Sequence, residues 1–146
     1  MAVSPFEHVR GVNTLTASTT LTHDGYAGQK IALNAAAGLT VTLPEATGSG
    51  VRYDVYVIAS VTSNAYVINC PASSEFYGHA TLGQDSANTV VQFDAADNDD
   101  QISMNGSTTG GLKGARITLT DTHTGHWHAE IEGTATGTEA TPFGTQ

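Results

Sequence analysis

Three histidines near the C-terminal end are the residues best suited to bind a metal ion, because His123, His126 and His128 follow the pattern H-x-x-H-x-H. Alternate residues of a β-strand face the same side, so a strand here would bring two of these imidazoles together. Structural zinc sites normally have three or four ligands, supported by further hydrogen bonds. The single cysteine, Cys70, is distant in the sequence. We therefore expect solvent-facing histidines on the strand face opposite Trp127, with a metal site as the alternative.

An acidic run offers a second possible cation site. Asp94, Asp97, Asp99 and Asp100 could supply the carboxylate oxygens that calcium prefers. The run lacks the alternate acids, central glycine and distant glutamate of a calcium-binding loop. We expect a solvated turn here, with calcium binding as the alternative.

Candidate catalytic groups are sparse. Glu130 and Glu132 would share one face of a strand, but this spacing is common by chance and does not define the separation that glycosidases require between their carboxyl groups. No G-x-S-x-G elbow is present, and the residues around Cys70 match no catalytic cysteine motif. We expect a protein that is not an enzyme and that takes no cofactor.

Aromatic side chains could form a stacking platform for sugar rings. Aromatic residues at alternating strand positions more often fill a core, and we favour that interpretation. The candidates are Tyr26, Tyr53, Tyr56, Tyr66, Tyr77 and Trp127.

The elements that must position these residues are predicted to be β-strands. Between Gln29 and Val57, apolar residues alternate with polar or small ones in two short runs, and a third run starts at Val51 after a Gly-Ser-Gly turn. This pattern predicts a β-meander. Further strands are expected near 14–22, 65–70, 88–93, 101–105, 115–120 and 126–133.

Short connections predict two hairpins, one between 51–58 and 65–70 and one between 115–120 and 126–133. Residues 71–87 have no sustained period and are expected to form a long ordered loop. No helix is predicted. The expected fold is all-β, an antiparallel β-sandwich or a small barrel-like domain of short strands.

Length and composition predict one domain. The chain has 146 residues, of which 39% are hydrophobic and 13% charged. We expect residues 14–132 to form a single β domain, with an N-terminal arm (1–13) and an extended C-terminal tail (133–146). The arm would be frayed or would become ordered on a partner. The sequence contains no apolar window long enough to span a membrane, and its start lacks the basic and apolar regions of a secretion signal.

The charge balance excludes two classes of partner. The formal net charge is −9, with 14 acidic and 5 basic residues. Surfaces that follow phosphate groups need clustered lysine and arginine, so we expect neither nucleic acid nor an anionic membrane as a partner. The basic residues are well spread along the chain: Arg10, Lys30, Arg52, Lys113 and Arg116.

Three segments together resemble a known family. They are LTASTTLT…GQKIALNAAAGLTVTLP (Leu15–Pro44), VTSNAYVI (Val61–Ile68), and GARITLTD…GHWHAE…GTATGTEATPF (Gly114–Phe143). In these segments the chain is similar to the small cement, or head decoration, proteins that stabilise the capsids of tailed bacteriophages. The resemblance covers most of the chain except residues 71–87, and it lies in strand and turn patterns.

The resemblance implies a trimeric all-β protein, made in the bacterial host cytoplasm, on the outer capsid surface of the virion. Its partner would be the major capsid protein of the same phage, with neighbouring subunits bridged against the pressure of packaged DNA. The capsid-contact candidates are Phe6, Val9, Arg10 and Phe143, in the two predicted arms. Related modules occur in tail fibres. The alternative is therefore a receptor- or carbohydrate-binding module that uses aromatic residues such as Trp127 and the 71–87 loop.

Overall fold

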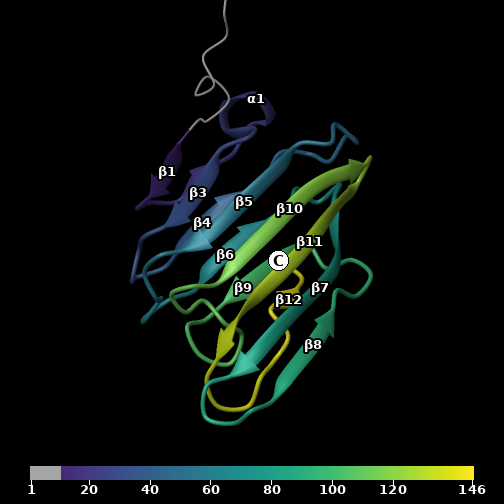
Figure 1. Cartoon of the computed structure of the whole chain (residues 1–146). Helices are drawn as coiled ribbons and strands as arrows, with labels where there is room; N and C mark the ends of the chain where they lie inside the picture. Colours follow the sequence, from purple (N-terminus) through teal and green to yellow (C-terminus); the bar gives the residue numbers. More distant parts are fainter. Residues whose placement is uncertain (1–10) are drawn as a thin grey trace, which may run out of the picture.

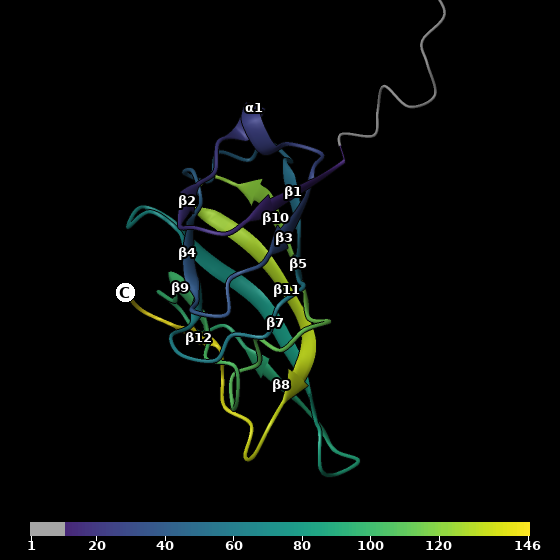
Figure 2. The same cartoon turned by 90° about the vertical axis from the view of Figure 1, so that its left-hand side faces the viewer.

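Two β-sheets pack against each other in the computed structural model, which describes residues 11–146 (Figure 1). Viewed from the side, the sheets form two layers (Figure 2). The seven-stranded sheet has the order β1 (Val12–Leu15), β3 (Lys30–Leu33), β5 (Arg52–Val57), β10 (Arg116–His123), β11 (His126–Ala135), β7 (Glu75–Gln84), β8 (Val90–Asp94). The five-stranded sheet has the order β12 (Phe143–Gly144), β9 (Gln101–Met104), β6 (Tyr66–Asn69), β4 (Leu39–Thr42), β2 (Thr19–Thr20). The predicted all-β sandwich is confirmed.

Strand pairing is mixed, whereas the sequence predicts antiparallel pairs. Strands β3, β4, β5 and β6 alternate between the two sheets, so strands that pair within a sheet are separated along the chain by a strand of the other sheet. They consequently run the same way, as in the parallel pairs β3–β5 and β4–β6. The predicted β-meander is therefore wrong. The predicted hairpin between 51–58 and 65–70 is also wrong, because β5 and β6 lie in opposite sheets.

The core lies between the layers and is filled by alternate residues of the strands. Trp127, Tyr53, Tyr66, Ile31 and Ile68 have no more than 1% of their surface exposed. Each large apolar side chain that is buried in this way contributes about 1.5–3 kcal/mol to folding. The β10–β11 hairpin is confirmed, with antiparallel pairing that extends from Arg116 opposite Glu132 to the turn at His123 and His126.

The segment predicted as a long loop contains one of the longest strands. Strand β7 pairs in parallel with β11 over its whole length. Phe76, Ala80 and Leu82 face the core. The inward position between Phe76 and Ala80 is occupied by Gly78, which has no side chain, so the alternation of apolar residues is interrupted there. Gly78 has a φ of +121°, and a Cβ there would lie 2.1 Å from the carbonyl oxygen of Ala129. The close approach of β7 to β11 requires glycine at this position. Because glycine also interrupts the apolar alternation, the sequence pattern does not predict β7.

The predicted C-terminal tail is largely incorporated into the sandwich. Strand β11 continues to Ala135, and β12 pairs with β9 through Phe143 opposite Ile102. Phe143 is 6% exposed and belongs to the hydrophobic core, because its strand adds to the edge of the five-stranded sheet and turns the ring inward. The interpretation of residues 133–146 as an extended arm is therefore wrong for these strands.

One helical turn, α1 (His23–Tyr26), also departs from the expectation of no helix. The Thr22 hydroxyl caps it by accepting a hydrogen bond from the Gly25 N–H at 3.0 Å. Within residues 11–146, no helix is long and apolar enough to cross a membrane.

Candidate functional site

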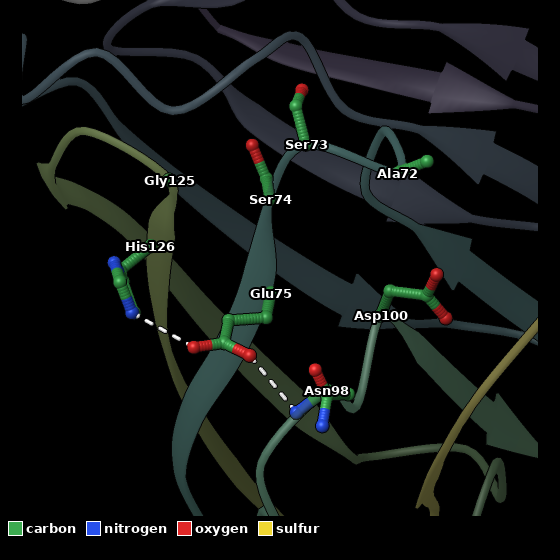
Figure 3. Close-up of a pocket in the computed structure, with 8 residues that line it drawn as sticks. All are labelled: Ala72, Ser73, Ser74, Glu75, Asn98, Asp100, Gly125 and His126. Atoms are coloured by element: carbon green, nitrogen blue, oxygen red, sulfur yellow. Dashed lines mark hydrogen bonds and ion pairs between the residues drawn. The ribbon is translucent and has the colours of Figure 1, made fainter.

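A polar hollow of about 290 Å³ lies where the start of β7 meets the turn between β10 and β11 (Figure 3). At its centre, Nε2 of His126 lies 2.8 Å from Oε1 of Glu75, and both side chains are about one-third exposed. The other carboxylate oxygen of Glu75 accepts a hydrogen bond from the Asn98 N–H at 2.9 Å. Glu75 therefore joins the β10–β11 turn to the loop between β8 and β9.

The remaining walls of the hollow come from segments far apart in the sequence. Ser74 is buried, and its hydroxyl accepts a hydrogen bond from the Ala46 N–H at 3.1 Å. A carboxylate oxygen of Asp100 accepts a hydrogen bond from the Gln146 N–H at 2.8 Å. Asn98 adopts a left-handed φ of 70°, a conformation that asparagine tolerates better than most residues. These contacts fix the polar groups around the hollow.

A cluster of four rings adjoins the hollow on the outer face of the seven-stranded sheet. We call Tyr77, His123, His126 and His128 the histidine cluster. The His123 and His126 rings stack with centroids 4.2 Å apart. The Tyr77 ring makes edge-to-face contacts with all three imidazoles, the nearest being His128 with centroids 4.9 Å apart. His126 belongs to both the cluster and the hollow, so the two form one continuous surface.

The sheet registers explain how these rings meet. Tyr77 and His128 are partners in the parallel β7–β11 pair, while His123 and His126 face each other across the end of the β10–β11 hairpin. Side chains alternate on β11, which places His126 and His128 opposite the buried Trp127. The predicted orientation of these histidines is therefore confirmed. Their contact with Tyr77 is not predictable from local spacing, because β7 is distant in the sequence.

The surroundings of His126 and Tyr77 define which groups the cluster presents. Both nitrogens of His126 have partners, Glu75 at Nε2 and the Thr124 carbonyl at Nδ1. Among residues 11–146, no group of three or more His, Cys, Asp or Glu side chains is placed to hold a metal ion. Tyr77 is 37% exposed, and its hydroxyl donates to the Thr122 hydroxyl at 2.8 Å. A partly exposed aromatic ring beside polar groups suits a polar ligand with an apolar face.

The acidic run does not converge. One carboxylate oxygen of Asp99 accepts a hydrogen bond from the Ala96 N–H at 2.8 Å, which closes the local turn. Asp94 accepts from the Gln92 side chain, and Asp100 accepts from the Gln146 N–H. Each of these three carboxylates thus has a different hydrogen-bond partner.

The paired glutamates are similarly dispersed. Glu132 forms an ion pair with Arg116 at 3.1 Å, while Glu130 lies on the same outer face without an ion-pair partner among the described residues. In the hollow, neither Ser73 nor Ser74 is hydrogen-bonded to His126 within the described chain, so these groups do not form a nucleophile–base pair there.

A buried carboxylate, Asp121, is surrounded by hydrogen-bond donors from the loop after β4. It is fully buried and accepts hydrogen bonds from the N–H groups of Thr47, Gly48 and Ser49, and from the hydroxyls of Thr47 and Ser49. His23 Nε2 lies 3.3 Å from it. Burial alone would raise the pKa of Asp121, but the hydrogen bonds from Ser49, Gly48 and Thr47 hold this pKa well below its ordinary value.

The sequence pattern of β10 indicates that Asp121 is buried. Ile117, Leu119 and Asp121 occupy successive inward positions of β10, and a carboxylate at such a position requires donors. Its donors come from the loop after β4, so they could not be named from the sequence. The same environment affects Tyr53: burial, together with the Asp121 charge, raises the pKa of the Tyr53 hydroxyl to about 12.

The predicted partner-contact residues are not brought together among the described residues. Phe6, Val9 and Arg10 lie outside the described residues. Phe143 lies in the core. Trp127 is also fully buried, and its indole N–H donates to the Pro44 carbonyl at 3.1 Å, so it cannot stack on a sugar ring.

Comparisons with known proteins do not assign a function to the hollow or to the histidine cluster. No protein-family model, no curated protein and no solved structure matches the chain. The functional conclusions that follow are therefore argued from the residues, from their geometry and from the sequence resemblance.

Proposed function

We propose that this chain is a structural protein of a tailed-bacteriophage virion. It binds the exterior of the capsid as a trimer and stabilises the capsid against internal DNA pressure by bridging neighbouring capsid subunits. The observation that carries the proposal is the resemblance of Leu15–Pro44, Val61–Ile68 and Gly114–Phe143 to capsid decoration proteins.

The position of these segments in the fold supports the proposal. They include β3, β4, β6, β10 and β11, which are inner strands of the two sheets. The resemblance therefore includes residues that build the sandwich as well as the turns and connections between its strands. A protein that must resist force benefits from a core of this kind, because interiors packed to crystal-like density deform little.

The charge and the N-terminal segment provide further support. A protein made in many copies must stay dispersed before assembly, and a net charge of −9 favours solubility. Segments that become ordered on a partner can span several subunits without a large core of their own. Phe6, Val9 and Arg10 supply two apolar anchors and one cation for such contacts. Because Phe143 is buried, the capsid-contact role is assigned to this segment alone.

Copy number per virion tests the proposal directly. Quantitative mass spectrometry of purified virions should give a ratio to the major capsid protein that approaches one to one. A handful of copies would instead place the chain in the tail, and absence from virions would overturn the proposal.

A binding assay tests the contact residues. The full-length chain should occupy capsids that lack it, and deletion of residues 1–10 should abolish occupancy while the far-ultraviolet circular dichroism spectrum stays unchanged. Ile58→Ser is a matched control, because Ile58 is apolar and 42% exposed but lies outside the N-terminal segment. Full occupancy by the deletion variant would remove the N-terminal segment from the proposal.

A second candidate function is supported by the histidine cluster. Tyr77 presents a partly exposed ring beside a polar hollow, an arrangement that suits a receptor- or carbohydrate-binding module of a tail fibre. A glycan array should then give hits that Tyr77→Ala removes and that Tyr56→Ala, a change in a half-buried tyrosine of the same sheet, retains. The absence of hits would eliminate this candidate.

A further inference from the structure

The two free edges of the seven-stranded sheet carry the most exposed large apolar side chains of the described chain. Val12 on β1 is 65% exposed, and Val90 on β8 is 69% exposed. Strands β1 and β8 are the first and last strands of this sheet, at opposite margins of the molecule (Figure 1). Each edge thus combines unpaired backbone groups with an exposed valine, which is the signature of a strand available for pairing.

The edges of the other sheet are built differently. Its edge strands, β2 and β12, contain two residues each, whereas β1 has four and β8 has five. Very short edge strands are a common protection against unwanted pairing. Neither β1 nor β8 contains the lysine or proline that usually blocks an edge, and Asp94 is their one charged residue, in a chain of net charge −9. Among residues 11–146, the seven-stranded sheet therefore has two edges of low charge that no other strand covers.

The alternation of hydrogen bonds between β7 and β8 shows which backbone N–H and C=O groups of β8 do not bond to β7. The Gln84 N–H donates to the Thr89 carbonyl, and the Ala95 N–H donates to the Gly78 carbonyl. In an antiparallel ladder, alternate residues bond to the same neighbour, so odd-numbered residues from 89 to 95 point toward β7. The backbone groups of Val90, Gln92 and Asp94 consequently point away from β7, to the side where no described strand lies.

The corresponding groups of β1 follow in the same way. The Gly11 carbonyl accepts from the Lys30 N–H, and the Leu15 carbonyl accepts from the Asn34 N–H. Odd-numbered residues of β1 therefore bond to β3, and the backbone groups of Val12 and Thr14 point to the free edge.

The directions of the two edge strands are opposite. The successive parallel and antiparallel pairs across the sheet leave β1 and β8 running antiparallel to each other. Rotation about an axis parallel to the strands leaves the strand directions unchanged. If copies of the chain are related by such a rotation, β1 of one copy can therefore lie beside β8 of the next copy as an antiparallel neighbour. The register partners of Val12 and Val90 place both valines on the outer face, so the pleats of the two edges match.

We propose that β1 of one copy pairs with β8 of the next copy, so that identical chains close into a ring with a continuous sheet. A second copy is the occupant that the structure favours, because every chain carries one edge of each kind and both are nearly uncharged. This head-to-tail contact satisfies both edges when the ring closes. Only the number of copies, three, rests on the proposed function; the pairing of the edges is argued from the sheet.

Molar mass in solution tests the edge pairing without any virion. Light scattering on the full-length wild-type chain should give three times the protomer mass of 15.1 kDa. Val12→Lys and Val90→Lys should each reduce the mass to that of one protomer, because a lysine is placed on one of the two pairing edges. Ile58→Lys, at an exposed aliphatic residue outside both edges, should leave the wild-type mass unchanged. Circular dichroism should show the same strand content in all four proteins.

Mixing the two edge variants separates head-to-tail pairing from a symmetric β8–β8 contact. Val12→Lys keeps an intact β8, and Val90→Lys keeps an intact β1, so an equal mixture should form a species of two protomers and nothing larger. A monomeric wild type, or a Val12→Lys variant that retains the wild-type mass, would overturn the proposal. Because no capsid is present, these outcomes are independent of the copy number that tests the proposed function.

Discussion

The Ser49 hydroxyl donates a hydrogen bond of 2.6 Å to Oδ2 of Asp121, and the Ser49 N–H reaches the same oxygen at 3.0 Å. These residues are 72 positions apart in the sequence. Ser49 lies on the segment that carries the chain from β4 in one sheet to β5 in the other, and Asp121 lies on β10. The carboxylate thus fixes this crossover to β10, the middle strand of the seven-stranded sheet.

Replacement of Asp121 by alanine should destabilise the protein strongly. The change removes a buried carboxylate and leaves the N–H groups of Thr47, Gly48 and Ser49 without their acceptor, and we expect the free energy of unfolding to fall by about 3 kcal/mol. Urea denaturation measures this loss. Asp121→Asn keeps one oxygen acceptor and should lose less, whereas equal losses for the two variants would argue against the hydrogen bonds as the cause.

Acid should destabilise the wild type partly through the same residue. The folded-state pKa of Asp121 is held below its unfolded value, so its contribution is present above the unfolded pKa and is lost as pH falls through the folded pKa. Stability should therefore decrease below about pH 4, the region of the ordinary aspartate pKa. Asp54 contributes in the same direction: burial raises its pKa, but hydrogen bonds from Lys30 and Arg52 outweigh that effect and lower it.

Urea midpoints measured across this acidic range provide the check. The slope of stability against pH should be shallower in Asp121→Asn than in the wild type, because the variant has no carboxyl group to titrate at this position. Identical slopes would show that other carboxylates account for the acid sensitivity.

The thiol of Cys70 should be unreactive in the native protein. Its side chain is 1% exposed, and burial, together with the nearby Asp100 charge, raises the pKa of the thiol to about 12. Ellman's reagent should label Cys70 only after denaturant is added. Rapid labelling under native conditions would mean that the segment around Asp100 opens readily.

Substitution of Gly78 should test the close contact between β7 and β11. A Cβ at this position would lie 2.1 Å from a backbone oxygen of Ala129, at a φ of +121°. We expect Gly78→Ala to reduce stability by about 3 kcal/mol. Gly83→Ala is the matched control on the same strand, because the nearest atom to its added Cβ is 4.0 Å away, and it should change stability by no more than about 0.5 kcal/mol.

Truncation of Phe143 should affect folding. The ring is part of the core and is 6% exposed, so Phe143→Ala should lower the free energy of unfolding by about 3 kcal/mol. Ile58→Ala, at an exposed site, should have little effect. Wild-type stability of Phe143→Ala would contradict a core role for this ring, and Phe143 would again be a candidate for contact with the capsid.

The alternation of apolar residues was sufficient to predict the all-β class, the β10–β11 hairpin and the inward position of Trp127 with His126 and His128 outside. These features depend on residues that are adjacent in the sequence, since side chains alternate along any strand regardless of its partner. Strand β7 was not predicted, because Gly78 removes an inward side chain from the pattern and the reason for that glycine lies on another strand.

The tertiary structure alone decided which strands pair and which side chains meet. The chain passes repeatedly from one sheet to the other, so neighbours in space are not neighbours in sequence, and a short connection such as 58–65 no longer implies a hairpin. The contact of Tyr77 with the three histidines, and of Asp121 with Ser49, arises from these crossings. Sequence patterns determine the local direction of each side chain, whereas the partner across a sheet is determined by how the whole core packs.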